Sequence, residues 1–301
     1  MKKTRLSFSA VSVDPARNTT LPQRGIERGP ERHSASSGNK KIPAIVDRKR
    51  SMKSSTYQYS KKRYGQSSRP RPFGEKNQYK NSNGVKIPPP ASGVIRIIPL
   101  GGVEEIGKNM TAVEIGDDII VIDAGMHFAN EATPGVDYVI PNTTYLEERK
   151  DKIRALIITH GHLEHFGGVP LVLSRIGNPP VYSRNLSILM MRKRQAEFPH
   201  LPAMKENVIE KDSVITLGKI KVRFFGVTHT IPDSVGIIIE TEHGWIVTPG
   251  DYKLDQVDGI VSKEEEKEYS IFDRAKVLLL MTDSTNIENE GFSLPEIKVH
   301  Q

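Results

Sequence analysis

Apolar residues are distributed unevenly along the 301 residues of the chain, and the pattern changes at residue 93. From there on, short apolar runs alternate with glycines and polar turns. The run 93–102 ends in two glycines and predicts a strand that leads into a turn. The β-rich runs 109–116 and 117–125 follow, joined by a Gly-Asp-Asp turn that is typical of a hairpin. The folded part is therefore expected to begin with consecutive strands.

Strands outnumber helices in the remainder of the sequence. Several of the runs are apolar throughout, which favours two sheets packed together and covered by helices, an α/β fold. We find no internal repeat. The predicted strands are 153–160, 179–183, 219–227, 234–241, 244–251 and 275–285, and the predicted helices are 167–177 and 184–198, the latter amphipathic with Leu186, Leu189, Met190 and Phe198 as core contacts.

Residues 1–92 have a different composition, rich in Ser, Pro, Asn, Gln, Lys and Arg and without helical or strand periodicity. They hold 21 Lys and Arg against 5 acids, a net charge of +16, which leaves 22 against 31, or −9, for the rest of the formal +7. Such a segment buries too little apolar surface to offset its ordering entropy. We therefore interpret 1–92 as a disordered basic arm.

The arm also suggests a partner, because aromatic residues lie among its cations. Phosphate attraction combined with base stacking is typical of binding to single-stranded nucleic acid. A solvated tail that keeps the protein soluble is the alternative. The candidate RNA-binding cations include Lys61, Lys62, Arg63, Arg69 and Arg71, and the interleaved aromatics are Tyr57, Tyr59, Tyr64, Phe73 and Tyr79.

The composition limits the kinds of site and the location. The chain has no cysteine, so disulfides and thiolate-bound zinc are excluded and any metal would be held by His and carboxylate. No apolar run approaches the ~20 residues that span a bilayer, and the N-terminal segment is too polar for a secretory signal. A cytoplasmic protein without a membrane partner is expected, with an organelle transit peptide as the lesser alternative.

The segment THGHLEHFGG, 159–168, carries the main candidate for chemistry. It follows an apolar strand and precedes a glycine-rich helix start. His160 and His162 alternate in extended chain, so both can face one ion, while Glu164 and His165 on the next turn can face a second. Ordinary histidines satisfied by hydrogen bonds are the alternative. The spacing H-x-H-x-E-H favours a metal site.

Further ligands are expected at the ends of other strands. His229 directly follows the strand 219–227, and Asp251 ends the run 244–251. Together with the histidine segment they make a consistent ligand set of nitrogens and oxygens. Asp123 lies at the end of a strand in the same way, although Asp before Gly is also an ordinary turn residue.

The order Asp123, H-x-H-x-E-H, His229, Asp251 resembles the metallo-β-lactamase superfamily, whose fold is an αβ/βα sandwich with a dinuclear zinc site. The segments IPLGGVEEIGKNM, GVDYVIPN, IRALIITHGH and MTDSTN together are similar to the ribonuclease J family of the β-CASP branch. This resemblance covers 93–295 and not the arm. It implies hydrolysis of RNA phosphodiesters in RNA processing and decay, by 5′-3′ exonuclease and endonuclease action with two Zn²⁺.

The resemblance also implies a role for individual residues. It implies that His160, His162 and His229 hold one zinc, that Glu164 and His165 hold the other, and that Asp251 bridges them. Asp123 would orient the histidine segment, as outer partners of metal ligands generally do. Asp283 matches the first acidic motif of the β-CASP branch, and with Asp251 and Glu164 it completes the predicted catalytic acids.

The sequence departs from the family pattern in two places. Glu164 stands where Asp is usual, and its longer side chain shifts or alters the second metal site. The chain also ends where the β-CASP insertion should begin, so we expect a fragment that lacks the final zinc ligand and the family's dimerisation region. Two alternatives remain: a thioester or lactone hydrolase of the same superfamily, and an RNA-binding remnant without catalysis.

Overall fold

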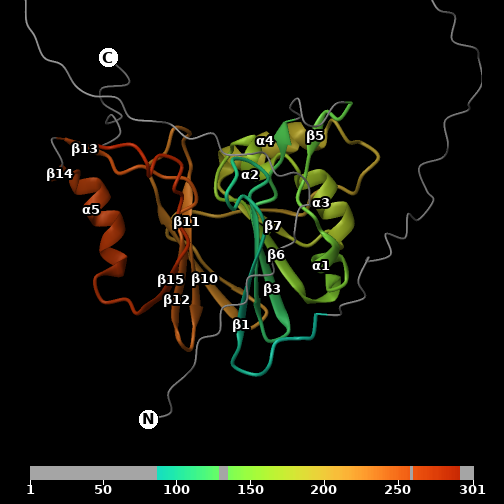
Figure 1. Ribbon diagram of the computed structural model, residues 1–301, viewed down its shortest axis with the longest axis horizontal. Helices are drawn as coiled ribbons and strands as arrows, with labels where there is room; N and C mark the ends of the chain where they lie inside the picture. Colours follow the sequence, from blue (N-terminus) through green and yellow to red (C-terminus); the bar gives the residue numbers. More distant parts are fainter. Residues whose placement is uncertain (1–86, 129–134, 258–259, 292–301) are drawn as a thin grey trace, which may run out of the picture. The chain divides into compact units, whose positions relative to one another are not determined.

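The computed structural model describes residues 87–128, 135–257 and 260–291. Two β-sheets form its centre (Figure 1). The first has the order β1-β2-β3-β6-β7-β8 and the second β15-β12-β11-β10-β9. The strands of the first are β1 (Ile95–Gly101), β2 (Met110–Ile115), β3 (Asp118–Ile122), β6 (Ile153–Ile157), β7 (Val181–Ser183) and β8 (Glu206–Val208); those of the second are β9 (Val214–Leu217), β10 (Ile220–Gly226), β11 (Val235–Thr241), β12 (Gly244–Thr248) and β15 (Val277–Leu280).

Helices lie on the outer faces of both sheets, with α1 and α3 beside the first sheet and α5 beside the second (Figure 1). Two short strand pairs, β4-β5 and β13-β14, complete the described fold. The remaining elements are β4 (His127–Phe128), β5 (Tyr138–Val139), β13 (Gln256–Val257), β14 (Ile260–Val261), α1 (Thr144–Glu147), α2 (Leu163–Phe166), α3 (Val169–Ile176), α4 (Asn185–Gln195), α5 (Lys263–Tyr269) and the 3₁₀ helices η1 (Lys150–Lys152) and η2 (Ser270–Phe272).

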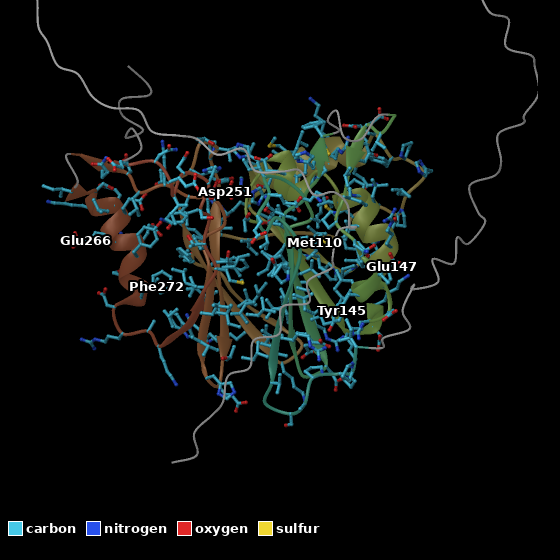
Figure 2. The ribbon with its side chains drawn as sticks, viewed as in Figure 1. Met110, Tyr145, Glu147, Asp251, Glu266 and Phe272 are labelled. Atoms are coloured by element: carbon cyan, nitrogen blue, oxygen red, sulfur yellow. The ribbon has the colours of Figure 1, made fainter. Side chains whose placement is uncertain are left out.

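The central strands are buried on both faces, which explains their unbroken apolar runs. One face of the first sheet packs against the second sheet, with Val113, Ile120 and Ile157 in the same cluster as Phe224 and Ile237. The opposite face packs under α1, α3 and α4, in a cluster that includes Met110 of β2 and Tyr145 of α1 (Figure 2). Phe272 packs on the outer face of the second sheet. The predicted α/β sandwich with helices outside is confirmed.

Strand direction gathers several loops at one end of the fold. In the first sheet β3 and β6 run parallel, and in the second β12 and β15 run parallel. β10 shares the direction of β12, because each is antiparallel to β11. The loops that leave the carboxyl ends of these strands carry Asp123, His160, His229, Asp251 and Asp283, so the topology brings the candidate residues to strand ends.

Two expectations need correction or restriction. Leu189 is 47% exposed, so its predicted core role is wrong; α4 instead turns Ile188 and Met191 inward, which leaves Leu189 on the solvent side.

Of the predicted arm, 1–86 lies outside the described residues. Residues 87–92 are neither helix nor strand, and Arg149 and Arg96 donate hydrogen bonds to the carbonyls of Ile87 and Pro88. No helix in the described ranges is long and apolar enough to cross a membrane.

The packing between the sheets predicts a large effect of truncating Phe224, which is 2% exposed in the shared core. Phe224→Ala should lower the free energy of unfolding by about 3–5 kcal/mol, since it removes buried apolar surface and leaves a cavity. Phe128→Ala, at a side chain 61% exposed, is the matched control and should change it by less than about 0.5 kcal/mol. Urea unfolding curves measure both, and equal losses would contradict the assignment of this core.

Candidate metal centre

Asp123 begins the site at the end of β3. Its backbone has φ of 60°, a left-handed conformation that is uncommon outside glycine. The side chain is buried, and Oδ1 accepts hydrogen bonds from the Thr159 amide at 2.8 Å and the Thr159 hydroxyl at 3.0 Å. Its Oδ2 lies 2.9 Å from Nδ1 of His165. Asp123 therefore connects the end of β3 to both ends of the histidine segment.

His160 follows β6 and is almost wholly buried, at 1% exposure. Its Nδ1 lies 3.0 Å from the Thr159 hydroxyl, which itself donates to Asp123. The hydroxyl therefore accepts from Nδ1–H of a neutral imidazole, and Nε2 is left with a free electron pair. This buried Nε2 has no hydrogen-bond partner among the described residues. An unpartnered buried nitrogen is costly in a folded protein, and it is the kind of atom that a metal ion would bind.

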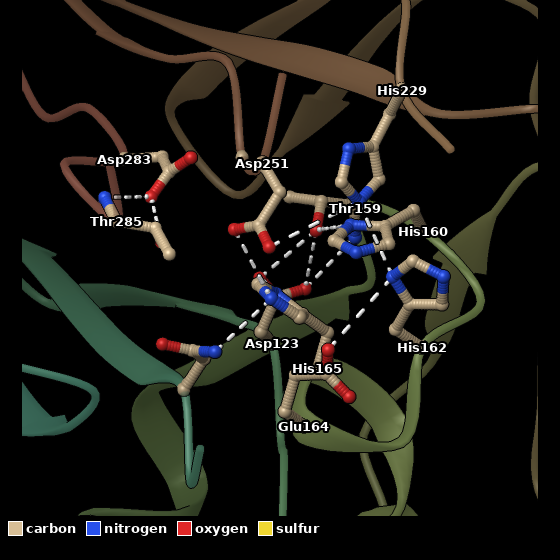
Figure 3. A network of polar contacts seen from close by, with 12 residues as sticks. Asp123, Thr159, His160, His162, Glu164, His165, His229, Asp251, Asp283 and Thr285 are labelled. Atoms are coloured by element: carbon tan, nitrogen blue, oxygen red, sulfur yellow. Dashed lines mark hydrogen bonds and ion pairs between the residues drawn. The ribbon is translucent and has the colours of Figure 1, made fainter. Parts of the chain in front are cut away.

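The imidazoles of His162 and His229 lie beside that of His160 and form a group of three (Figure 3). His160, His162 and His229 offer ring nitrogens that all lie within 4.8 Å of one another. Nε2 of His229 is 3.2 Å from Nδ1 of His162, and the His160 ring contacts both edge-on. His162 and His229 come from different sheets, so the group spans the interface between them. Three ring nitrogens this close together could hold one metal ion.

A second group lies beside the first and shares His160. It comprises His160, His165 and Asp251, again with ligand atoms within 4.8 Å of one another. Nε2 of His165 is 3.2 Å from Oδ1 of Asp251, and Oδ2 of Asp251 is 4.0 Å from Nε2 of His229. Asp251 thus faces histidines of both groups, and its bridging role stays a prediction.

The electrostatics of the histidines differ sharply. Burial, reinforced by the charge of His165, lowers the pKa of His160 to about 2. Burial alone would also lower the pKa of His165, but the charges of Asp123 and Asp251 and its hydrogen bonds to them outweigh this and raise it to about 10. Burial would raise the pKa of Asp251, but the hydrogen bond and charge of His165 bring it to about 2. Without metal, one imidazole is therefore neutral and its neighbour is a cation between two carboxylates.

Two predicted residues lie apart from these groups. The Glu164 side chain is 38% exposed and turns its carboxylate toward His162, with Oε1 3.8 Å from Nδ1 (Figure 3). The carboxylate of Asp283 accepts hydrogen bonds from the amide of Thr285 at 2.8 Å and from its hydroxyl at 2.6 Å, closing a turn after β15. The described part of the chain brings neither carboxylate into the two groups, and their roles stay predictions.

The residues around the ligands include two that the sequence did not single out. Asn109 lies with its side-chain amide 3.0 Å from Nε2 of His165, and its backbone amide donates to the Glu164 carbonyl at 3.0 Å. Thr159 sets the tautomer of His160. Asn109 is part of the segment IPLGGVEEIGKNM, and Thr159 immediately precedes the first histidine. Only their position in or next to a motif could have pointed to these two residues, since neither residue type is a usual zinc ligand.

The chain is similar in sequence to known proteins of one superfamily. Residues 104–260 match the family model described as the Metallo-beta-lactamase superfamily. The chain is 42% identical over 206 residues to Ribonuclease J2 of Bacillus subtilis (strain 168) and 39% identical over 213 residues to Ribonuclease J of Thermus thermophilus. It is 37% identical over 203 residues to Ribonuclease J 2 of Staphylococcus aureus (strain NCTC 8325 / PS 47). The matches cover 67–68% of this chain but only 36–37% of those proteins.

The opposite pKa shifts predict how the metal-free protein titrates. His160 should stay neutral and His165 protonated between pH 5 and pH 8, because their pKa values are about 2 and about 10. The pKa of a histidine in the unfolded chain is about 6.5. The His160 contribution to stability should therefore be lost as pH falls below about 6.5, and the His165 contribution as pH rises from about 6.5 toward 10.

Nitrogen-detected NMR of the imidazoles in chelator-treated protein measures this directly. His160→Gln and His165→Gln variants assign the two resonances and serve as controls for one another. Ordinary titration of both rings near pH 6.5 would contradict the described arrangement.

Proposed function

Because the chain belongs to the metallo-β-lactamase superfamily and is homologous to ribonucleases J over about two thirds of its length, we propose that it is a metal-dependent hydrolase that cleaves RNA phosphodiester bonds. The chain spans a little over a third of the length of these relatives. Cleavage of RNA both from a 5′-monophosphate end and internally is therefore part of the proposal.

The observation that carries the proposal is the buried, unpartnered Nε2 of His160 at the junction of the two ligand groups. His160, His162 and His229 would hold one ion. His165 and Asp251 would hold the other, with Asp251 between the two and Glu164 as the further ligand that the motif predicts. The donor set of imidazole nitrogens and carboxylate oxygens without sulfur suits Zn²⁺. Two bound ions would supply an ionised water and neutralise charge on the phosphodiester.

The chain's own residues prepare the site for this chemistry. Asp123 holds His165 at Nδ1 and so leaves Nε2 to face Asp251. Thr159 holds His160 at Nδ1 and leaves its Nε2 bare. Such hydrogen bonds fix the ring orientation and strengthen the imidazoles as ligands. Glu164, Asp251 and His229 are partly exposed, so one side of the site would be accessible to a substrate.

The basic arm would supply affinity for the RNA backbone. It lies outside the described residues apart from 87–92, so this part of the proposal depends on its composition. Its 21 cations would attract phosphates, and its aromatics would stack on bases. Catalysis and backbone affinity would then reside in separate parts of the chain, and the cytoplasmic location stays a prediction.

The first test replaces a ligand. His162→Ala should reduce the bound zinc by about one equivalent and lower RNA hydrolysis at least about 100-fold, since one ion would lose one of its three histidine ligands. Salt-sensitive RNA binding should persist, because the arm is intact. Metal analysis, cleavage of 5′-monophosphorylated RNA and filter binding measure the three quantities.

Three outcomes would count against the proposal. Loss of RNA binding together with the zinc would disprove the separation of roles. Preference of the unmodified protein for a small thioester over RNA would favour another hydrolase of the superfamily, and less than one zinc per chain would favour a non-catalytic remnant. Leu189→Ala, at an exposed side chain, is the matched control and should leave all three quantities unchanged.

The second test removes the arm. Deletion of residues 1–92 should leave the zinc content unchanged and flatten the dependence of RNA affinity on salt. The slope of log K against log salt should fall by roughly 0.7 for each phosphate contact that is lost. Binding measured between 50 and 200 mM salt gives this slope for both proteins. An unchanged slope would place the RNA contacts on the folded domain instead.

A further inference from the structure

The loop 227–234, which carries His229, continues into the segment IPDS, to which the proposed function gives no role. The loop lies between β10 and β11 and is anchored at both ends. The amide of Lys253 donates to the Thr228 carbonyl at 2.8 Å, and the amide of Val235 donates to the Thr159 carbonyl at 3.1 Å. Both anchors adjoin ligand-bearing segments, since Lys253 follows Asp251 closely and Thr159 precedes His160.

Between these anchors, Asp233 makes a third connection, toward α4. Its backbone has φ of 62°, a left-handed conformation that Asp and Asn tolerate better than most residues. Its Oδ2 accepts from the Leu186 amide at 3.2 Å, and its Oδ1 accepts from Nη2 of Arg184 at 3.1 Å. The residue that precedes α4, Arg184, gives its helix no side-chain cap. Asp233 therefore caps α4 from a different loop.

The same helix also packs against the histidine segment. Gly161 lies between the first two histidines, and a Cβ there would stand 2.7 Å from Sδ of Met190 and 3.6 Å from Oγ of Ser187. The helix therefore packs closely against the turn that presents His160 and His162. Through Asp233 it also holds the loop that presents His229, so one helix touches the carriers of all three imidazoles.

We propose that Asp233 is a positioning residue that fixes His229 against His160 and His162 by way of α4, and so sets the affinity of the three-histidine group for a divalent transition-metal ion. This inference depends on the proposed metal site. The side chain of Asp233 bonds to Arg184 and Leu186 and not to the proposed ligand atoms. It acts through its two carboxylate oxygens, which accept hydrogen bonds from the Leu186 amide of the helix and from the Arg184 guanidinium.

Asp233→Asn is the sharpest test, because asparagine keeps the size and the left-handed backbone but offers one acceptor atom where two are used. The expected result is a zinc Kd about tenfold weaker, in the range found when outer partners of metal ligands are replaced. A chelator competition titration on the full chain measures the Kd, and the Co²⁺ absorption spectrum should change with it. Glu197→Gln removes an ion pair with Arg194 at the C-terminal end of α4 and should leave both readouts unchanged.

A cycle with His162→Ala identifies the ion that is affected. In that background the three-histidine group is already broken, so Asp233→Asn should weaken the remaining zinc no further. If Asp233→Asn lowers the thermal stability of the metal-free protein but keeps the zinc Kd of the unmodified chain, Asp233 is merely structural and the inference is overturned.

Two further outcomes keep the inference separate from the proposed function. Should Asp233→Asn fail to fold, Arg184→Gln removes the Oδ1 donor together with the ion pair between Arg184 and Glu210, and Glu210→Gln removes that ion pair alone. A zinc Kd weaker in Arg184→Gln than in Glu210→Gln supports the inference, and equal Kd values overturn it. If the unmodified chain itself binds no zinc, the proposed metal-dependent function fails at that step. Zinc binding that is normal in the unmodified chain and equally tight in both variants overturns only the role of Asp233.

Discussion

Asp123 leaves β3 in a left-handed backbone conformation and directs both carboxylate oxygens at the histidine segment, one to Thr159 and one to His165. The carboxylate is buried, so its charge is unscreened by water and must be matched by nearby donors. Those donors fix the segment on either side of His160 and His162. The geometry of the three imidazoles of this segment, His160, His162 and His165, therefore depends on one carboxylate that contacts none of the nitrogens proposed to bind an ion.

The backbone around this carboxylate is equally constrained. The amides of Ala124 and Met126 donate to the carbonyls of His165 and Leu163 at 2.8 and 3.1 Å, which pairs the chain after β3 with α2. Gly125 lies so close to the Glu164 carbonyl that a side chain there could not be accommodated. The loop after β3 and the histidine segment after β6 are consequently held together, and both follow strands of the first sheet. The second sheet contributes His229 and Asp251 separately, so their alignment depends on contacts between the sheets and on α4.

Much of this arrangement follows from the sequence, because apolar runs locate the buried strands and ligand-type residues fall directly after them. The pattern of apolar runs alone is enough to put Asp123, His160, His229 and Asp251 at strand ends. Side-chain direction does not follow from that pattern. Leu189 and Ile188 are adjacent apolar residues, and only packing decides that Ile188 faces the core. Glu164 is the same kind of case, since a motif specifies the residue but not its rotamer. The contacts of Asp233 could not be predicted from the sequence pattern, because its partners, Arg184 and Leu186, are 47 or more residues away in sequence.

The charge distribution within the site explains why such directions matter. The imidazolium of His165 lies between Asp123 and Asp251, so two carboxylates already surround a positive charge. His160, beside them, is kept neutral by burial and by that same positive charge. A positive charge between the two carboxylates relieves their mutual repulsion. In the metal-free protein the protonated His165 supplies this charge, and its Nε2 is the atom that faces Asp251. The surroundings therefore favour positive charge at this point whatever carries it, which is the electrostatic condition that a centre built to hold divalent cations has to satisfy.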